Sequence, residues 1–202
     1  MPRTKEQNER MRQATRDKIQ AAAAELFARK GLAGTNVQEI ADLAGISIGL
    51  LYRHYKTKDA LFAEMVDFAL EGLEKITELF ESEGSPQDLI MQIVREVHHD
   101  LVSNGEFINL LILLTQAFLS DSTTGGVDRL VAQDARMLEA TSRLIERGQR
   151  LGEFRQGNPM EMSSMLYSTI QGLGIMKGVM GDQLSIPSPE MMTAHLRIER
   201  KD

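Results

Sequence analysis

The stretch from Thr35 to Lys58, T-N-V-Q-E-I-A-D-L-A-G-I-S-I-G-L-L-Y-R-H-Y-K-T-K, constrains the fold of this 202-residue chain most strongly. Its first apolar residues recur at the spacing of one helical face, and Gly45 then ends that helix because glycine accepts a left-handed backbone. Thr35 and Gln38 predict a capping box for the first helix, and Ser47 can cap a second. Two short helices joined by so tight a turn are typical of a helix-turn-helix, whose second helix enters a DNA major groove.

The same stretch resembles the DNA-binding signature of the tetracycline-repressor (TetR) family of bacterial regulators. The matching run from Ile40 to Leu61 is I-A-x-x-A-G-I-S-x-G-x-L-Y-x-H-Y-x-x-K-x-x-L, and the resemblance covers about the first third of the chain. Together with the helix pattern it predicts an all-α fold of nine helices, in which a three-helix DNA-binding domain precedes a helical domain for effector binding and dimerisation. The core of the motif is expected to consist of Ile40, Ala41, Ala44, Gly45, Ile46 and Leu51.

The resemblance also implies roles for single residues. Phosphate contacts are expected from Thr35, Ser47, Tyr52, His54 and Lys58, and base contacts from Ile48, Gly49, Leu50 and Arg53. Arg53 is the candidate for a bidentate guanine contact, whereas Ile48 and Leu50 can touch only thymine methyl groups. This helix is therefore sparse in direct readout, and recognition of DNA shape is an alternative source of specificity.

The charge distribution agrees with a DNA-binding amino-terminal end. Residues 1–58 hold 11 Lys and Arg against 6 Asp and Glu, whereas residues 59–202 hold 12 against 23. Such a chain can present one face to phosphate and repel phosphate elsewhere. There is no cysteine, which excludes disulfides and cysteine-based catalysis. No run reaches the roughly 18 apolar residues of a membrane span, and the first ten residues lack the apolar core of a secretory signal.

Proline, glycine and capping residues divide the chain into helices. Residues 1–11 are polar and are expected to form a flexible arm, either a simple tail or an arm whose Arg3 and Lys5 reach a minor groove. The DNA-binding domain is expected over 12–58, extending to about 72 with a linking helix, and the body over 59–202. Helices are expected at 12–30, 57–81, 86–103, 106–119, 127–150, 159–181 and 189–200, in addition to the two of the motif.

The 159–181 segment contains three glycines, which are unfavourable in a helix. Close approach of a partner helix would offset that cost. In the family, the last two long helices form a four-helix dimer interface, and the residues that fit such a seam here are Ser164, Ser168, Gly172, Leu173, Met176 and Met180. The alternative is that the glycines pack against a helix of the same chain.

An effector pocket is expected from the resemblance, and the twelve methionines of the chain suit an adaptable interior. Residues from several helices that could line it are Met65, Met91, Phe107, Leu111, Leu114, Met137, Met165 and Tyr167. Polar anchors could come from Asn109, Gln116, Gln133, Tyr167 or Gln171. Methionine stripes are more often core than ligand site, so the pocket rests on the resemblance.

The sequence therefore predicts a cytoplasmic, homodimeric transcription regulator, a repressor by the habit of the family. Its partners would be a palindromic double-stranded operator and a small, apolar or amphipathic effector, with no membrane. Alternatives are a regulator without an effector and a helical interaction module that has lost DNA binding. An enzyme is not expected, since no acid–base constellation is present, and no cofactor is expected. A metal site is not expected either, because the side chains of the adjacent His98 and His99 diverge on a helix.

Overall fold

The computed structural model describes residues 5–103, 106–119 and 127–198, and within these ranges it is all-α, with nine α-helices and no strand. The helices are α1 (Lys5–Gly34), α2 (Val37–Leu43), α3 (Ile48–His54), α4 (Lys58–Glu81), α5 (Pro86–Ser103), α6 (Glu106–Leu119), α7 (Val127–Leu151), α8 (Pro159–Met180) and α9 (Pro189–Met192). Two single 3-10 turns, η1 (Gly181–Gln183) and η2 (Ala194–Leu196), follow α8 and α9.

The bounds of α5, α6, α7 and α8 agree with the sequence to within one residue, because each begins at a local signal. For example, Asn158 caps α8, and its side chain accepts hydrogen bonds from the amides of Met160 (3.0 Å) and Glu161 (3.3 Å). The first helix is also broken where expected, at Gly31, whose φ is 72°.

Two predicted helices have the wrong length. The first begins at Lys5, so residues 5–11 are helical and are not a flexible arm; Glu, Gln, Lys and Arg dominate this segment, and Glu6 pairs with Arg10 one turn later. Residues 1–4, including Arg3, lie outside the described part. The helix expected over 189–200 stops at Met192, and the chain then bends so that the carbonyl of Leu196 accepts a hydrogen bond from the Arg155 amide.

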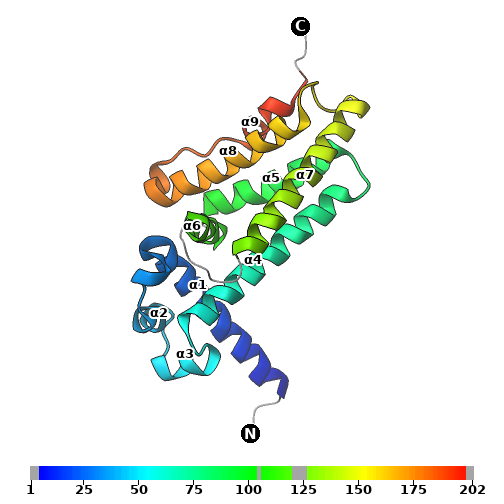
Figure 1. Ribbon diagram of the computed structural model, residues 1–202. Coiled ribbons are helices and arrows are strands. Elements are labelled where there is room, and N and C mark those ends of the chain that lie inside the picture. Colours follow the sequence, from blue (N-terminus) through cyan, green and yellow to red (C-terminus); the bar gives the residue numbers. More distant parts are fainter. Residues whose placement is uncertain (1–4, 104–105, 120–126, 199–202) are drawn as a thin grey trace.

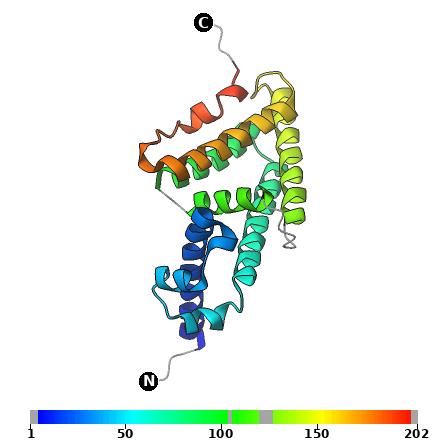
Figure 2. The same cartoon turned by 60° about the vertical axis from the view of Figure 1, so that its left-hand side comes forward.

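The molecule has two ends joined by α4 (Figure 1). Helices α1 to α3 form one end, and α4 runs from this end into the body, where it packs against α7. On its other side α7 packs against α8, and α6 lies between α1 and α8 (Figure 2). None of the described helices combines the length and the apolar character that a membrane crossing requires.

Each end has its own hydrophobic core. The first core is built around Phe27, Ile40, Leu51 and Leu61 from α1 to α4, and Leu130 of α7 is buried in it. The second core joins α4 to α9, with Ile90, Leu144 and Leu166 among its buried members. Leu110 and Leu114 of α6 pack against the first core, so α6 connects the body to the helix-turn-helix end.

Candidate nucleic-acid interface

Helices α2 and α3 form the predicted helix-turn-helix, but the capping box lies one residue later than predicted. Asn36, not Thr35, caps α2: its side chain accepts a hydrogen bond from the Gln38 amide at 2.9 Å, and the Glu39 carboxylate accepts one from the Asn36 amide at 3.3 Å. Asn and Thr both cap helices, and their order along the chain does not decide which residue adopts the extended backbone of a cap.

The turn between α2 and α3 has the predicted glycine at the end of α2 and the predicted serine cap of α3. Gly45 has a φ of 67°, and the next amide, that of Ile46, donates to the Ala41 carbonyl at 3.0 Å. The Ser47 hydroxyl accepts a hydrogen bond from the Leu50 amide at 3.2 Å and so caps α3. Of the residues predicted for the motif core, Ile40, Ala41 and Leu51 are buried, Ala44 and Ile46 pack against the same cluster, and Gly45 supplies the turn.

Two residues expected to hold phosphates are used inside the protein. The Thr35 side chain is only 3% exposed, and its hydroxyl donates to the Gly31 carbonyl at 2.8 Å. The Lys58 ammonium donates to the carbonyls of Leu32 (2.8 Å), Ala33 (3.2 Å) and Thr35 (3.2 Å), which uses all three of its N–H bonds. Both side chains therefore fasten the end of α1, and in this conformation neither is available to DNA, contrary to the prediction.

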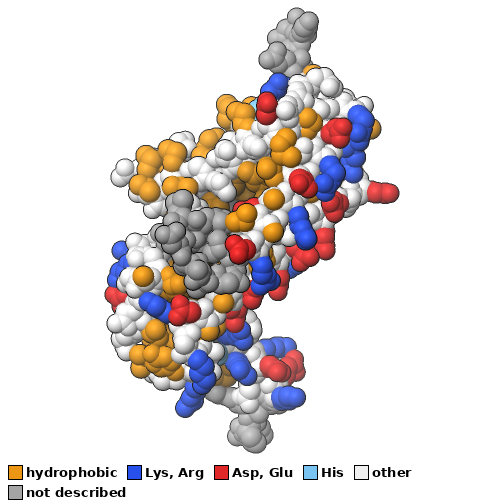
Figure 3. All heavy atoms as spheres, viewed as in Figure 1, with side chains coloured by type: hydrophobic (Ala, Val, Ile, Leu, Met, Phe, Trp, Pro, Cys, Tyr) orange, Lys and Arg blue, Asp and Glu red, His pale blue; other side chains and the backbone are white. Residues whose placement is uncertain are grey.

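The outer face of α3 is open to solvent. Tyr52 is 43% exposed, Arg53 and Ile48 are also exposed, and Leu50 is half-buried. A Cβ atom added to Gly49 would meet no atom within 4 Å, so this position leaves a flat area over which a DNA backbone or base edge could approach. Lys and Arg side chains lie around this end of the molecule (Figure 3).

His54 differs from the other candidates because one side of its imidazole is enclosed. Its Nδ1 is buried and has no hydrogen-bond partner among the described residues. Burial lowers the pKa of His54 below its ordinary value, and the charges of Arg12 and Arg16 lower it further, against the opposing effect of Glu64. At neutral pH this imidazole can therefore offer a phosphate a hydrogen bond but no full charge.

Sequence reasoning missed two basic residues beside α3. Arg12 lies close enough to His54 to affect its charge, and Lys56 is exposed directly after α3. Arg12 could have been found from its spacing, since it precedes Arg16 by four residues and shares its helix face. Lys56 could have been found because it directly follows Tyr55, a residue of the run that resembles the family signature.

The residues predicted to line an effector pocket lie in different surroundings, as far as the structure describes them. Met65 belongs to the core of the helix-turn-helix end, Leu114 packs against that same core, and Met165 is 54% exposed on α8. Leu111 approaches Gly174, and Met137 is buried.

The side chains of Phe107 and Gln116 lie outside the described part. Of the other polar candidates, Asn109 is half-buried, Gln133 donates to the Thr77 hydroxyl at 3.4 Å, and Gln171 is exposed.

Tyr167 is an enclosed polar group among these candidates. Its hydroxyl lies 2.6 Å from that of Thr141 on α7, and burial raises the pKa of Tyr167 to about 12. Burial also raises the pKa of Asp134, which lies near enough for its charge to act on Tyr167. Helices α7 and α8 thus hold a polar pair within the apolar body.

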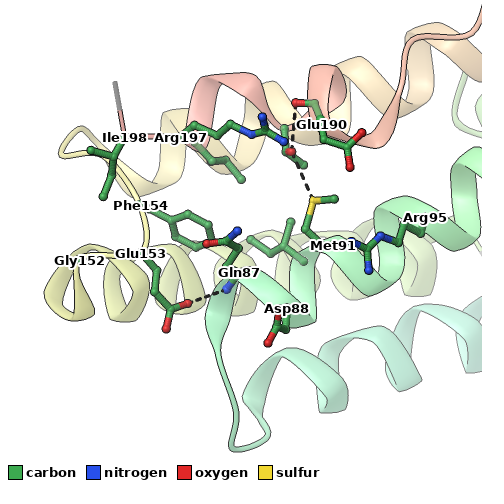
Figure 4. A pocket seen from close by; sticks show the side chains of 13 residues that line it. Gln87, Asp88, Met91, Arg95, Gly152, Glu153, Phe154, Glu190, Arg197 and Ile198 are labelled. Carbon is green, nitrogen blue, oxygen red and sulfur yellow. Dashed lines mark hydrogen bonds between the residues drawn. The ribbon is translucent and has the colours of Figure 1, made fainter. Parts of the chain in front are cut away.

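A hollow of about 830 Å³ lies instead beside α5 and α9 (Figure 4), and α9 is at the opposite end of the molecule from α3 (Figure 1). Its apolar floor includes Ile90, Met91, Phe154 and Leu196, and its charged rim is formed by Asp88, Arg95, Glu153, Glu190 and Arg197. Met91 is the one predicted pocket residue that it includes.

The residues predicted for a dimer seam lie along α8. Ser164, Ser168 and Met176 are exposed, as is Met180, whereas Leu173 is half-buried and packs against the body core. The three glycines separate into two groups. A Cβ added to Gly174 or Gly178 would come within 2.3 Å of Leu111 or Ile112 of α6, so these two allow packing inside the chain, but Gly172 has no atom within 4 Å of that position.

Comparison with known proteins gives a consistent picture. A model of "Bacterial regulatory proteins, tetR family" matches residues 19–65. The HTH-type transcriptional repressor KstR2 of Mycolicibacterium smegmatis is 38% identical in a region that covers 32% of this chain and 39% of that protein. The chain spans less than half the length of the curated relatives it matches.

Solved structures resemble nearly the whole chain. The repressor NalD of Pseudomonas aeruginosa, described as the secondary repressor of the MexAB-OprM multidrug efflux pump, is 26% identical with a TM-score of 0.64, covering 96% of this chain and 98% of that one. AibR, solved with isovaleryl coenzyme A and operator DNA, is 15% identical with a TM-score of 0.65, covering 89% and 94%. At that identity the second likeness concerns the fold alone.

Proposed function

We propose that this chain, which belongs to the TetR family of bacterial transcriptional regulators, is not an enzyme but a repressor that binds a palindromic operator as a dimer. A small-molecule effector would release it. A role at a bacterial operator also places the protein in the cytoplasm.

The observation that carries the proposal is the two-sided character of α3. Leu51 is buried on one side, while Tyr52 and Arg53 are exposed on the other, beside the bare surface at Gly49. Tyr52, His54, Arg12 and the amino end of α3 at Ser47 are suited to phosphates, and Arg53 is suited to a guanine edge. Base contacts by Ile48 and Leu50 would be apolar.

The dimer would form along α8. Ser164, Ser168 and Gly172 follow one another at four-residue spacing, and Ser164 and Ser168 are exposed while Gly172 has open space where a side chain would be. Small residues in such a row allow a second helix to approach closely. Met165 and Met176, both exposed, flank the row with apolar surface that a partner would cover.

Release would depend on α4, which begins in the helix-turn-helix end and packs against α7 in the body. An effector that binds the body better in one conformation than in another shifts the population of the two. The distance between the two α3 helices of a dimer would then leave the value of about 34–36 Å that successive major grooves require. AibR, which shares this fold, was solved in complex with isovaleryl coenzyme A and operator DNA.

Selection of bound sequences from random double-stranded DNA tests the proposal. We expect a palindrome, and a duplex with only one half-site should bind about 100-fold more weakly than the full palindrome. Affinity should fall steeply with salt, because phosphate contacts release counterions. Recovery of no common sequence, or equal affinity for one and two half-sites, would contradict the proposal.

A regulator without an effector is the second candidate, favoured by the separation of two predicted pocket residues, since Met65 lies in the first core and Met165 is exposed on α8. A thermal-shift screen of apolar and amphipathic compounds, followed by operator-binding titrations, distinguishes the two. A compound that raises the melting temperature and weakens operator binding supports the effector model. Compounds that bind but leave the affinity and salt dependence for the operator unchanged support the alternative.

A further inference from the structure

One carboxylate joins three helices at the helix-turn-helix end. Glu64 of α4 accepts hydrogen bonds from Gln20 of α1 at 2.6 Å and from the Tyr55 hydroxyl at 2.7 Å. Arg16 of α1 forms an ion pair with the same carboxylate, with a second contact from its Nε at 3.2 Å. The cluster reaches α3 through Tyr55, which is buried, whereas Tyr52 and Arg53 of α3 are exposed.

Tyr55 gives the cluster its importance, because it is the C-cap residue of α3. Its amide donates to the Leu51 carbonyl at 2.9 Å, its ring is buried, and the Arg16 guanidinium lies 5.6 Å from the centre of that ring. Burial, followed by the hydrogen bond to Glu64, raises the pKa of Tyr55 to about 12, so its hydroxyl stays protonated and keeps donating.

Few other contacts hold α3, the helix proposed to enter the major groove. It is seven residues long, and Leu51 is its one buried side chain. Its amino end is held by the turn and the Ser47 cap. A single apolar side chain restrains rotation of so short a helix poorly, and its carboxyl end is held through Tyr55.

We propose that Glu64 is a positioning residue for DNA recognition: by accepting from Tyr55, Gln20 and Arg16 it sets the angle of α3 relative to α1 and α4. The inference rests on the proposed function. Base contacts need side chains placed to a fraction of an ångström, whereas phosphate attraction tolerates small rotations. Glu64 should therefore matter for the preference between sequences more than for attraction to DNA in general.

The test compares the selected operator with a random duplex of equal length at one salt concentration. Glu64→Ala should bind the operator about tenfold more weakly, while its affinity for the random duplex changes less than about twofold. Tyr55→Phe should change the ratio in the same direction, and adding it to Glu64→Ala should cost less than it does alone, because the two groups share one interaction. Glu64→Gln keeps an oxygen acceptor for Tyr55 and should restore part of the loss.

Asp67→Ala is the matched control, since it also removes a carboxylate from α4 but one that pairs with exposed Arg129 of α7. It should leave the operator preference unchanged. A purely structural role for Glu64 would weaken both duplexes together, in step with the melting temperature. An unchanged preference in folded Glu64→Ala and Tyr55→Phe would overturn the proposal.

Amide hydrogen exchange of the DNA-free protein separates this inference from the proposed function. Glu64→Ala should speed exchange in the last turn of α3 and at Tyr55, with α2 as the internal reference, and Asp67→Ala should not. If the wild-type protein prefers no DNA sequence, the proposed function fails. The exchange measurement then still decides whether Glu64 holds α3, and equal exchange in the wild type and Glu64→Ala refutes it.

Discussion

Arg53 is the exposed guanidinium of α3, and its neighbour Tyr52 carries an exposed hydroxyl. Arg53→Ala should relax the preference at one base pair of each half-site, at a cost of about 1–3 kcal/mol for the preferred base. Tyr52→Phe should instead weaken binding to all duplexes similarly, since phosphates are the same in every sequence. Competition binding with operators substituted at each position measures both, and equal losses at every position for Arg53→Ala would remove its role in base reading.

Lys58 is a second single-residue case, because its ammonium is held by three carbonyls at the end of α1 and the loop that follows. Lys58→Met keeps the aliphatic stem and should lower the free energy of unfolding by about 1.5–3 kcal/mol, as the loss of charged hydrogen bonds does. Urea denaturation measures the effect, with the exposed Lys56→Met as control. If Lys58→Met leaves the stability unchanged but weakens binding to all duplexes, Lys58 contacts phosphate, as the sequence predicted.

His54 makes stability depend on pH. Its pKa in the folded protein is lowered from the ordinary 6.5, chiefly by burial, so the unfolded chain takes up the proton first as the pH falls. The free energy of unfolding should therefore decrease as the pH falls below about 6.5, and this part of the loss should be absent in His54→Gln. His195 has a lowered pKa for the same main reason and contributes in the same direction. Parallel pH curves for the wild type and His54→Gln would show that the imidazole is freely solvated.

At the scale of the element, two helical glycines should respond oppositely to alanine. A Cβ on Gly148 of α7 would lie 2.2 Å from the ring of buried Phe154, so Gly148→Ala should destabilise the fold by about 1–3 kcal/mol. A Cβ on Gly72 of α4 would meet nothing within 4 Å, so Gly72→Ala should stabilise the fold by about 1 kcal/mol through helix propensity. Thermal and urea unfolding measure both. A stabilising Gly148→Ala would mean that the ring of Phe154 moves aside readily.

At the scale of the whole molecule, the proposed dimer joins two helix-turn-helix ends through α8. Ser168→Arg places a charged side chain in the middle of the row of small residues and should convert the dimer to a monomer in light-scattering measurements. Operator affinity should then fall by about 100-fold, because the second half-site no longer binds within one assembly. The exposed Glu71→Arg on α4 is the control. A Ser168→Arg protein that remains dimeric would place the interface elsewhere.

The sequence alone determined the features that depend on neighbours within about four residues. Capping side chains, prolines and glycines marked the starts of α5, α6, α7 and α8, and helical spacing identified the buried side of the helix-turn-helix. These signals act through backbone hydrogen bonds and local conformation. The helix starts that these signals specify are therefore the same whatever packs around them.

Only the tertiary structure decided how the side chains are used. The side chains of Thr35 and Lys58 form hydrogen bonds with carbonyls at the end of α1. Gly174 and Gly178 pack closely against α6, whereas Gly172 has open space beside it. The Glu64 carboxylate accepts a hydrogen bond from the Tyr55 hydroxyl. The tertiary structure also separated predicted pocket residues, because Met65 lies in the first core and Met165 lies on the surface. Each of these outcomes depends on groups from different helices meeting in space, and a helical pattern specifies which face is buried but not which residue it will meet.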